Sequence, residues 1–85
     1  GKKGAVCSFL YKLMHQFGVE VEDGVLIDFT VTNEDIAGFC GISTRNSVNR
    51  IIHDLKEEGI VAIYNQKLLI LDKLYLEEFT SRENF

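Results

Sequence analysis

The sequence predicts an α+β fold: a three-helix core, two small β-hairpins and a short C-terminal helix. Two observations predict the helices and hairpins: apolar residues recur at helical spacing in several segments, and they alternate with polar residues in others. A third observation is length. With 85 residues, a single domain spanning residues 1–85 is expected. The chain has no proline, so its turns depend on Gly, Asn and Asp.

The first predicted helix runs from about Ala5 to Phe17, because apolar residues recur there at three- and four-residue steps. Gly18 stands where a helix stop is expected. A hairpin follows over residues 19–31, with Asp23-Gly24 predicted as a two-residue turn in which both residues take positive φ. The alternation places one set of apolar side chains on the same side: Val19, Val21, Val25, Ile27, Phe29 and Val31.

Two helices joined by a glycine turn are predicted next. Thr32 is the expected N-cap of a short helix that ends at Gly41, and Ser43 or Thr44 caps a longer helix that reaches Glu58. The predicted apolar stripe of the short helix consists of Ile36, Ala37, Phe39 and Cys40.

A second hairpin closes the predicted core. After Gly59, residues 60–64 and 67–71 form the expected strands, joined at Asn65-Gln66, and Asp72 caps the final helix. A short helix, a glycine turn, a longer helix and a hairpin follow one another in a winged helix-turn-helix. We therefore assign this fold to the chain.

The net charge of −4 conceals an uneven distribution of charge along the chain. Residues 20–35 carry six acidic and no basic residues, whereas residues 36–53 carry two arginines and no acidic residue. The sign of the charge on the contacting face decides binding to nucleic acid, so the total does not exclude it. An acidic total does predict weak non-specific affinity.

The longer helix has two faces of opposite chemistry. Its apolar face, expected in the core, consists of Val48, Ile51, Ile52 and Leu55. The other face carries hydrogen-bond donors, with Arg45 on the flank. Arginine pairs bidentately with guanine and asparagine with adenine in the major groove. The residues predicted to read DNA bases are Arg45, Asn46, Asn49 and Arg50. An ordinary solvated face is the alternative interpretation.

Three stretches, residues 32–37, 41–52 and 55–60, resemble the C-terminal DNA-binding domain of the Crp-Fnr superfamily of bacterial transcription regulators. The resemblance extends over nearly the whole chain. In that family the second helix enters the major groove, commonly with the motif Arg-Glu-Thr-Val-x-Arg. Arg45 and Arg50 match its two arginines, Ser47 its threonine, and Asn46 stands in place of its glutamate. The usual half-site of the family is therefore not expected.

The turn before Arg45 is one residue longer than usual, which resembles most closely the branch containing the virulence activator of Listeria. Thr32 matches the family threonine that caps the first helix and touches phosphate. His53 is expected either to reach a phosphate or to lie over the helix, four residues after Asn49. Lys67 is expected either to contact the phosphate backbone from the wing or to be solvated. The full set of expected phosphate contacts is Thr32, Ser43, Thr44, Ser47, His53 and Lys67.

The resemblance also implies the context of the domain. The parent protein is expected to be a cytoplasmic homodimer that binds an inverted-repeat operator in double-stranded DNA and contacts RNA polymerase. Its N-terminal sensor domain lies outside these residues, so no cofactor is expected in this domain and the effector is unknown. The longest apolar runs are far below the ~20 residues of a membrane span, and no membrane partner is expected.

Two other classes of function differ from DNA binding in the residues they require. An enzyme is not expected, because no nucleophile–base set and no glycine-rich phosphate loop is present. Cys7 and Cys40 lack the spacing of a zinc or disulfide site and are interpreted as small core residues. The alternative to DNA binding is a winged helix used for protein–protein contact. That function requires an exposed apolar patch, whereas the apolar stripes of the helices are all expected in the core.

Overall fold

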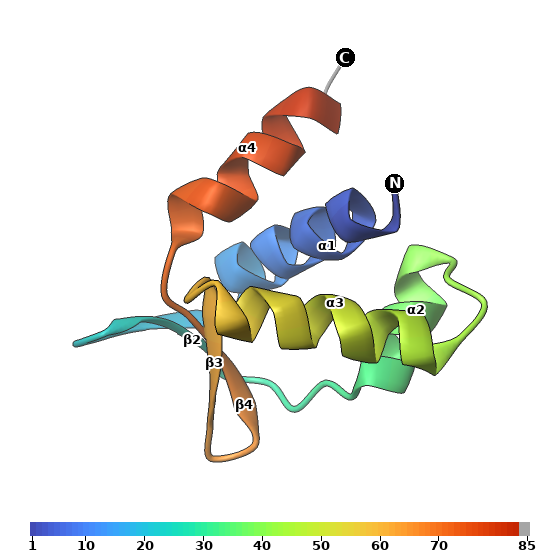
Figure 1. Cartoon of the computed structure of the whole chain (residues 1–85). Helices are drawn as coiled ribbons and strands as arrows, with labels where there is room; N and C mark the ends of the chain where they lie inside the picture. Colours follow the sequence, from blue (N-terminus) through green and yellow to red (C-terminus); the bar gives the residue numbers. More distant parts are fainter. Residues whose placement is uncertain (84–85) are drawn as a thin grey trace.

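In the computed structural model, which describes residues 1–83, the elements follow in the order α1 (Lys2–Phe17), β1 (Gly18–Val21), β2 (Gly24–Ile27), α2 (Asn33–Cys40), α3 (Arg45–Glu57), β3 (Val61–Tyr64), β4 (Lys67–Ile70) and α4 (Lys73–Glu83) (Figure 1). The predicted fold class and the predicted order of helices and hairpins are confirmed.

The two hairpins join into one antiparallel sheet with the strand order β1-β2-β4-β3. The join is made by β2 and β4, in which Val25 lies opposite Ile70 and Leu26 lies opposite Leu69. The turn at Asn65 and Gln66 is confirmed, with φ values of 51° and 66°. This hairpin is the wing, and it lies next to the end of α3 (Figure 1).

The first hairpin turn differs from its prediction. Val21 pairs with Gly24, so the turn consists of Glu22 and Asp23, one residue earlier than expected. Neither Asp23 nor Gly24 has positive φ. Gly24 is needed for a different reason: a Cβ there would lie 2.1 Å from the carbonyl oxygen of Ile70. The glycine allows β2 and β4 to approach closely, which sequence patterning within one hairpin does not reveal.

The observed strand pairing also corrects the predicted alternation. Cross-strand partners share a face, and Val19 is opposite Leu26 whereas Val25 is opposite Glu20. Val19 and Val21 therefore lie on the outer face of the sheet and are exposed, while Val25 and Ile27 face the core. The expectation that these four side chains all point one way is wrong. After a two-residue turn, odd-numbered residues of the second strand lie on the opposite face from odd-numbered residues of the first.

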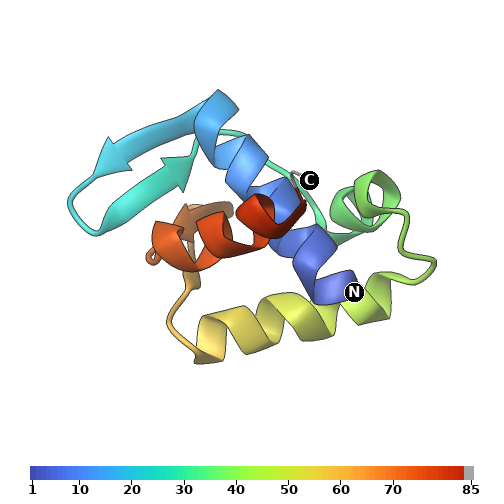
Figure 2. The same cartoon turned by 90° about the horizontal axis from the view of Figure 1, so that it is seen from above.

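The core lies between the helices and the inner face of the sheet. α4 packs along α1, which Figure 2 shows from above, and α3 runs beside them. Every element from α1 to α4 other than β1 contributes to the set of fully buried large side chains, which includes Leu10, Ile27, Ile36, Val48, Leu55, Val61, Ile70 and Leu76. Cys7 is buried in this core, and Cys40 is half-buried, with its thiol donating to the backbone oxygen of Ala5 at 3.6 Å. Burial raises the pKa of the Cys7 thiol to about 11.

Several apolar residues of the predicted helices do not enter the core, among them Phe39 and Leu74. Phe39 of α2 is 75% exposed and stacks on Phe9 of α1, with ring centroids 5.2 Å apart. Leu74 of α4 is 65% exposed. The expectation that the core needs every apolar residue of the helices is therefore wrong. No helix within residues 1–83 combines the length and apolar character needed to cross a membrane.

Candidate nucleic-acid interface

The start of α2 is fixed by a capping box. The Thr32 hydroxyl accepts a hydrogen bond from the backbone N–H of Asp35, and the Asp35 carboxylate accepts one from the backbone N–H of Thr32, each at 3.0 Å. The Thr32 backbone N–H, followed by its hydroxyl, holds the pKa of the Asp35 carboxyl below its usual value. Thr32 is thus the N-cap that the sequence predicts.

The turn between α2 and α3 is equally well defined. Gly41 takes the left-handed conformation, with φ of 68°, and the next residue, Ile42, is buried. Of the two predicted caps, Thr44 is the one used: its hydroxyl accepts from the backbone N–H of Ser47 at 3.3 Å. The recognition helix α3 therefore begins at Arg45, and Glu58 is its C-cap.

The structure brings the predicted base-reading residues together. One face of α3 is buried through Val48, Ile52 and Leu55, which fixes the rotation of the helix about its axis. The exposed side of the same helix carries Arg45, Asn46, Asn49 and Arg50. Asn46, Asn49 and Arg50 share one face, and Arg45 lies on its flank.

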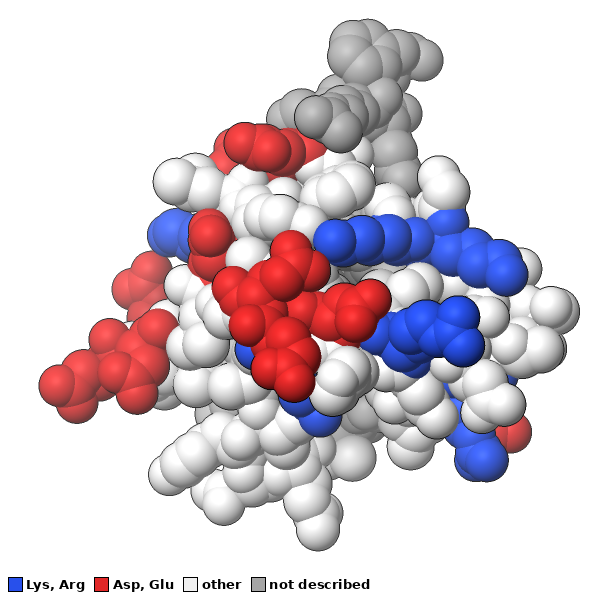
Figure 3. Space-filling model, in the orientation of Figure 1, with Lys and Arg blue, Asp and Glu red and all other residues white. Residues whose placement is uncertain are grey.

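The charges on α3 are segregated along its length. From Arg45 to His53 the helix contains two arginines and no acidic residue, whereas Asp54, Glu57 and Glu58 follow at its end. Figure 3 shows the acidic side chains around the C-terminal end of α3 and basic side chains over the half nearer α2. A polyanion is therefore attracted to the N-terminal half of α3 and repelled by its C-terminal end.

Two of the predicted phosphate-binding hydroxyls, those of Thr32 and Thr44, serve as N-caps. The hydroxyls of Thr44 and Ser47 lie 3.0 Å apart and hydrogen bond to each other at the start of α3, while Ser43 is exposed beside them. These residues, together with Thr32, flank the N-terminal ends of α2 and α3.

The structure places two of the predicted phosphate-contacting side chains beside acidic ones. The His53 Nε2 lies 3.6 Å from a carboxylate oxygen of Glu57, one turn further along α3. The Lys67 ammonium donates to the carboxylate of Asp28 and forms an ion pair with it. A phosphate contact by Lys67 therefore competes with this ion pair.

One residue that sequence reasoning missed contacts the exposed side of α3 that carries the predicted base-reading residues. Asn33, the first residue of α2, donates a hydrogen bond from its side-chain Nδ2 to the Oδ1 of Asn49 at 2.6 Å. The two residues are sixteen positions apart, so no helical spacing connects them. Only the packing of α2 against α3 brings the two amides together.

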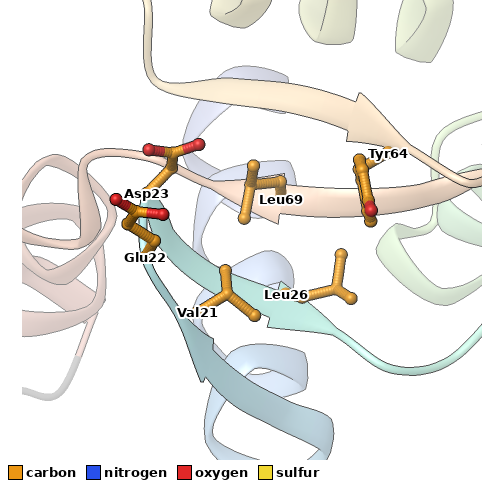
Figure 4. A pocket seen from close by; sticks show the side chains of 6 residues that line it. All are labelled: Val21, Glu22, Asp23, Leu26, Tyr64 and Leu69. Atoms are coloured by element: carbon orange, nitrogen blue, oxygen red, sulfur yellow. The ribbon is translucent and has the colours of Figure 1, made fainter.

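The outer face of the sheet carries a shallow apolar hollow (Figure 4). Leu26 and Leu69 lie side by side in it on β2 and β4, with Val21 beside them and Tyr64 at one end. The acidic turn of the first hairpin borders the other end. The sequence did not predict this surface, because it placed Val21 on the same side as Val25 and Ile27, which face the core.

Comparison with known proteins gives a family match over most of the chain. Residues 4–79 match the family described as the Crp-like helix-turn-helix domain. The chain is 55% identical over 76 residues to the lactate racemization regulatory protein of Lactiplantibacillus plantarum, covering 89% of this chain and 34% of that protein. It is 45% identical over 73 residues to the anaerobic regulatory protein of Bacillus subtilis, covering 86% of this chain and 30% of that protein.

A solved structure agrees with the fold. The CO-dependent transcription factor CooA from Carboxydothermus hydrogenoformans superposes with a TM-score of 0.83 at 30% identity, over 92% of this chain and 36% of CooA. The chain spans about a third of the length of the curated relatives it matches. Neither of the two relatives named above is a virulence activator, so they give no support to the predicted likeness to the Listeria branch.

Proposed function

The chain belongs to the family of Crp-like helix-turn-helix domains, the DNA-binding domains of Crp-Fnr-type transcription regulators, and from this membership we propose how it reads its operator. α3 enters the major groove of double-stranded DNA with its N-terminal half toward the base edges. Arg45, Asn46, Asn49 and Arg50 contact bases there.

The observation that carries this proposal is the exposed face of α3. Nine consecutive residues, from Arg45 to His53, include no acidic side chain, in a chain whose net charge is −4. The apolar side of the same helix is buried, so the donors are held outward with little freedom of rotation of the helix. An acid-free donor face of this kind fits a groove lined by phosphates and base acceptors.

Phosphate contacts position the helix. We assign them to the residues at the N-terminal ends of α2 and α3, namely Thr32, Ser43, Thr44 and Ser47. Backbone N–H groups and hydroxyls at helix N-termini are suited to phosphate oxygens. Lys67 and His53 contribute only where a phosphate replaces the carboxylate of Asp28 or Glu57.

The parent protein is proposed to be a cytoplasmic transcription regulator with a further, N-terminal sensor domain, to which any effector binds. It acts as a homodimer on an inverted repeat, because two recognition helices related by a two-fold axis read two-fold related half-sites. Contact with RNA polymerase is part of the same proposal. Assignment to the Listeria branch is not part of it.

The test is a selection of bound sequences from a random duplex pool with the full-length parent protein. We expect an inverted repeat with conserved guanine or adenine positions in each half. The double variant Arg45→Ala/Arg50→Ala is expected to abolish enrichment. Lys12→Ala, which removes an exposed cation from α1, is the control and is expected to retain it. Equal loss in the control and the double variant would show that only overall charge matters.

Protein–protein contact is the second candidate function, and the apolar hollow of Figure 4 favours it. This surface lies on the sheet, whereas the DNA-reading residues lie on α3. Leu69→Ser, in the hollow, is therefore expected to leave operator selection unchanged. A domain that enriches no sequence, and whose variants in α3 are silent, would favour the second candidate.

A further inference from the structure

The hydrogen bond between Asn33 and Asn49 joins the first residue of α2 to the DNA-facing side of α3. Asn33 is half-buried and follows Thr32 directly, whose capping box fixes the backbone at this point. Asn49 is exposed and shares its helix face with Asn46 and Arg50. A side-chain donor at the start of α2 thus meets a side chain on the exposed face of α3.

A side-chain amide has two chemically opposite ends. Its oxygen accepts hydrogen bonds and its NH2 group donates them. An unheld asparagine rotates about its last side-chain bond and presents either end to a base. Here the Asn33 Nδ2 takes up the Oδ1 of Asn49 at 2.6 Å, so the acceptor end of Asn49 is turned toward α2. The Nδ2 of Asn49 is left as the end that projects from the pair.

The two ends discriminate between two groups of bases in the major groove. Guanine and thymine present the acceptors O6 and O4, whereas adenine and cytosine present amino donors at the corresponding positions. An NH2 group that projects toward this position donates to the first pair of bases and meets donor against donor at the second, whereas the N7 acceptor of adenine lies at a neighbouring position of the groove edge. An asparagine held in this way does not make the bidentate adenine contact, which needs its oxygen free at the same edge.

We propose that Asn33 is a specificity-determining residue that holds Asn49 with its amide donor outward, so that Asn49 selects guanine or thymine and rejects adenine and cytosine at one base pair. This inference rests on the proposed function, since it requires α3 to lie in the major groove. Asn33 acts through Asn49 and is a positioning residue. The proposed preference for guanine or thymine replaces the adenine preference that the residue type of Asn49 alone indicates.

Two variants of Asn33 separate this role from a purely structural one. Asn33→Ala removes the donor and releases the amide of Asn49. Asn33→Asp places an acceptor of the same shape at the same point, which attracts the Nδ2 of Asn49 and turns its oxygen outward. Alanine and aspartate both suit the first position of a helix, so α2 is expected to form in each variant. Circular dichroism and thermal melting confirm the fold of each protein before binding is measured.

The experiment uses the 85-residue chain at low salt with the duplex obtained from the selection above and its single-base-pair variants. Affinities are measured by fluorescence anisotropy. For the unmodified chain we expect one base pair at which guanine or thymine is favoured over adenine and cytosine by about fivefold, the effect of one hydrogen bond. Asn33→Ala is expected to reduce this ratio toward one, and Asn33→Asp to reverse it.

The ratio is measured within each variant, so the added charge of Asn33→Asp, which weakens binding to all duplexes alike, cancels from it. Asn49→Ala should reduce the same ratio at the same base pair. An unchanged ratio in both Asn33 variants, or a preference for adenine or cytosine in the unmodified chain, overturns the inference while the proposed function stands. Failure of the full-length parent to enrich any duplex in the selection overturns the proposed function and this inference with it.

Discussion

Arg50 and Arg45 occupy different places on the same helix. Arg50 lies near the centre of the exposed donor face of α3, whereas Arg45 is the first residue of the helix, on the flank. We expect Arg50→Ala to cost about 1–3 kcal/mol of binding free energy and to relax preference at one base pair. Arg45→Ala is expected to change base preference less than Arg50→Ala does, because Arg45 lies on the flank of that face. Binding to a panel of single-base variants at several salt concentrations measures both effects. Uniform weakening by Arg50→Ala, with only a smaller salt slope, would assign Arg50 to phosphate.

Asn46 stands where the family motif has glutamate, and the structure places it one turn before Arg50 on the exposed face. Glutamate accepts from the amino group of cytosine, whereas an asparagine amide both donates and accepts and suits adenine. Asn46→Glu is therefore expected to move the preference at one base pair toward cytosine and to lower affinity for every duplex, because a carboxylate is brought near phosphates. Duplexes that differ only at that pair provide the measurement. An unchanged preference would place Asn46 against the backbone or solvent.

At the scale of single elements, the capping box makes the stability of α2 depend on pH. The Thr32 backbone N–H binds the ionised carboxyl of Asp35 and lowers its pKa from 3.8 in the folded state. A lowered pKa contributes stability that is present above pH 3.8 and is lost as the pH falls through the folded-state value. Urea unfolding of Asp35→Asn and of the unmodified chain should therefore differ at pH 7 and converge toward pH 3. Glu34→Gln is the control, because it removes a negative charge from the same turn of α2 and leaves the capping box intact. A gap that stays constant with pH would contradict this explanation.

The wing turn holds a strained residue. Gln66 has φ of 66°, a conformation that costs a residue with a Cβ about 1–2 kcal/mol, while Asn65 at 51° tolerates it better. Gln66→Gly removes the strain but increases the entropy of the unfolded chain. We expect a net stabilisation of about 0.5–1 kcal/mol, measured by urea unfolding. Gln66→Ala keeps the strain and should give no such gain, so equal stabilisation by the two variants would exclude backbone strain as the cause.

The elements that sequence patterning predicted best are those whose signals are local. The caps Thr32, Gly41 and Thr44 each act within a few residues of the backbone groups that they satisfy, and the structure uses all three. The first hairpin was predicted less well because its glycine is required by a neighbouring strand. Gly24 approaches the carbonyl of Ile70, a contact between residues far apart in the chain, and the turn shifts accordingly.

At the scale of the whole molecule, the interface also has a part that local sequence signals predict and a part that depends on contacts between distant residues. The donor face of α3 follows from helical periodicity, because burial of Val48, Ile52 and Leu55 determines which residues remain outside. The partners of that face do not follow from periodicity. The contact of Asn33 with Asn49 and that of Lys67 with Asp28 join separate elements, and both depend on how the elements pack.

The isolated chain is expected to be a monomer that binds DNA weakly. A single recognition helix engages one half-site, whereas a two-fold dimer engages two that lie one helical turn apart. Few cations face the groove, since Arg45 and Arg50 are the basic residues between positions 36 and 53 and Lys67 is paired with Asp28.

With about two to four neutralised phosphates, the plot of log binding constant against log salt should have a slope of about −2 to −4. The dissociation constant is expected to be about 10⁻⁶–10⁻⁴ M at physiological salt. Sedimentation equilibrium without DNA checks the monomer, and anisotropy titrations at several salt concentrations check the slope. The covalent joining of two copies by a flexible linker should raise affinity for an inverted repeat but not for a single half-site, because the second contact becomes intramolecular. A tight dimer of the 85 residues alone would contradict the expectation, since the dimer contacts would then lie within this domain.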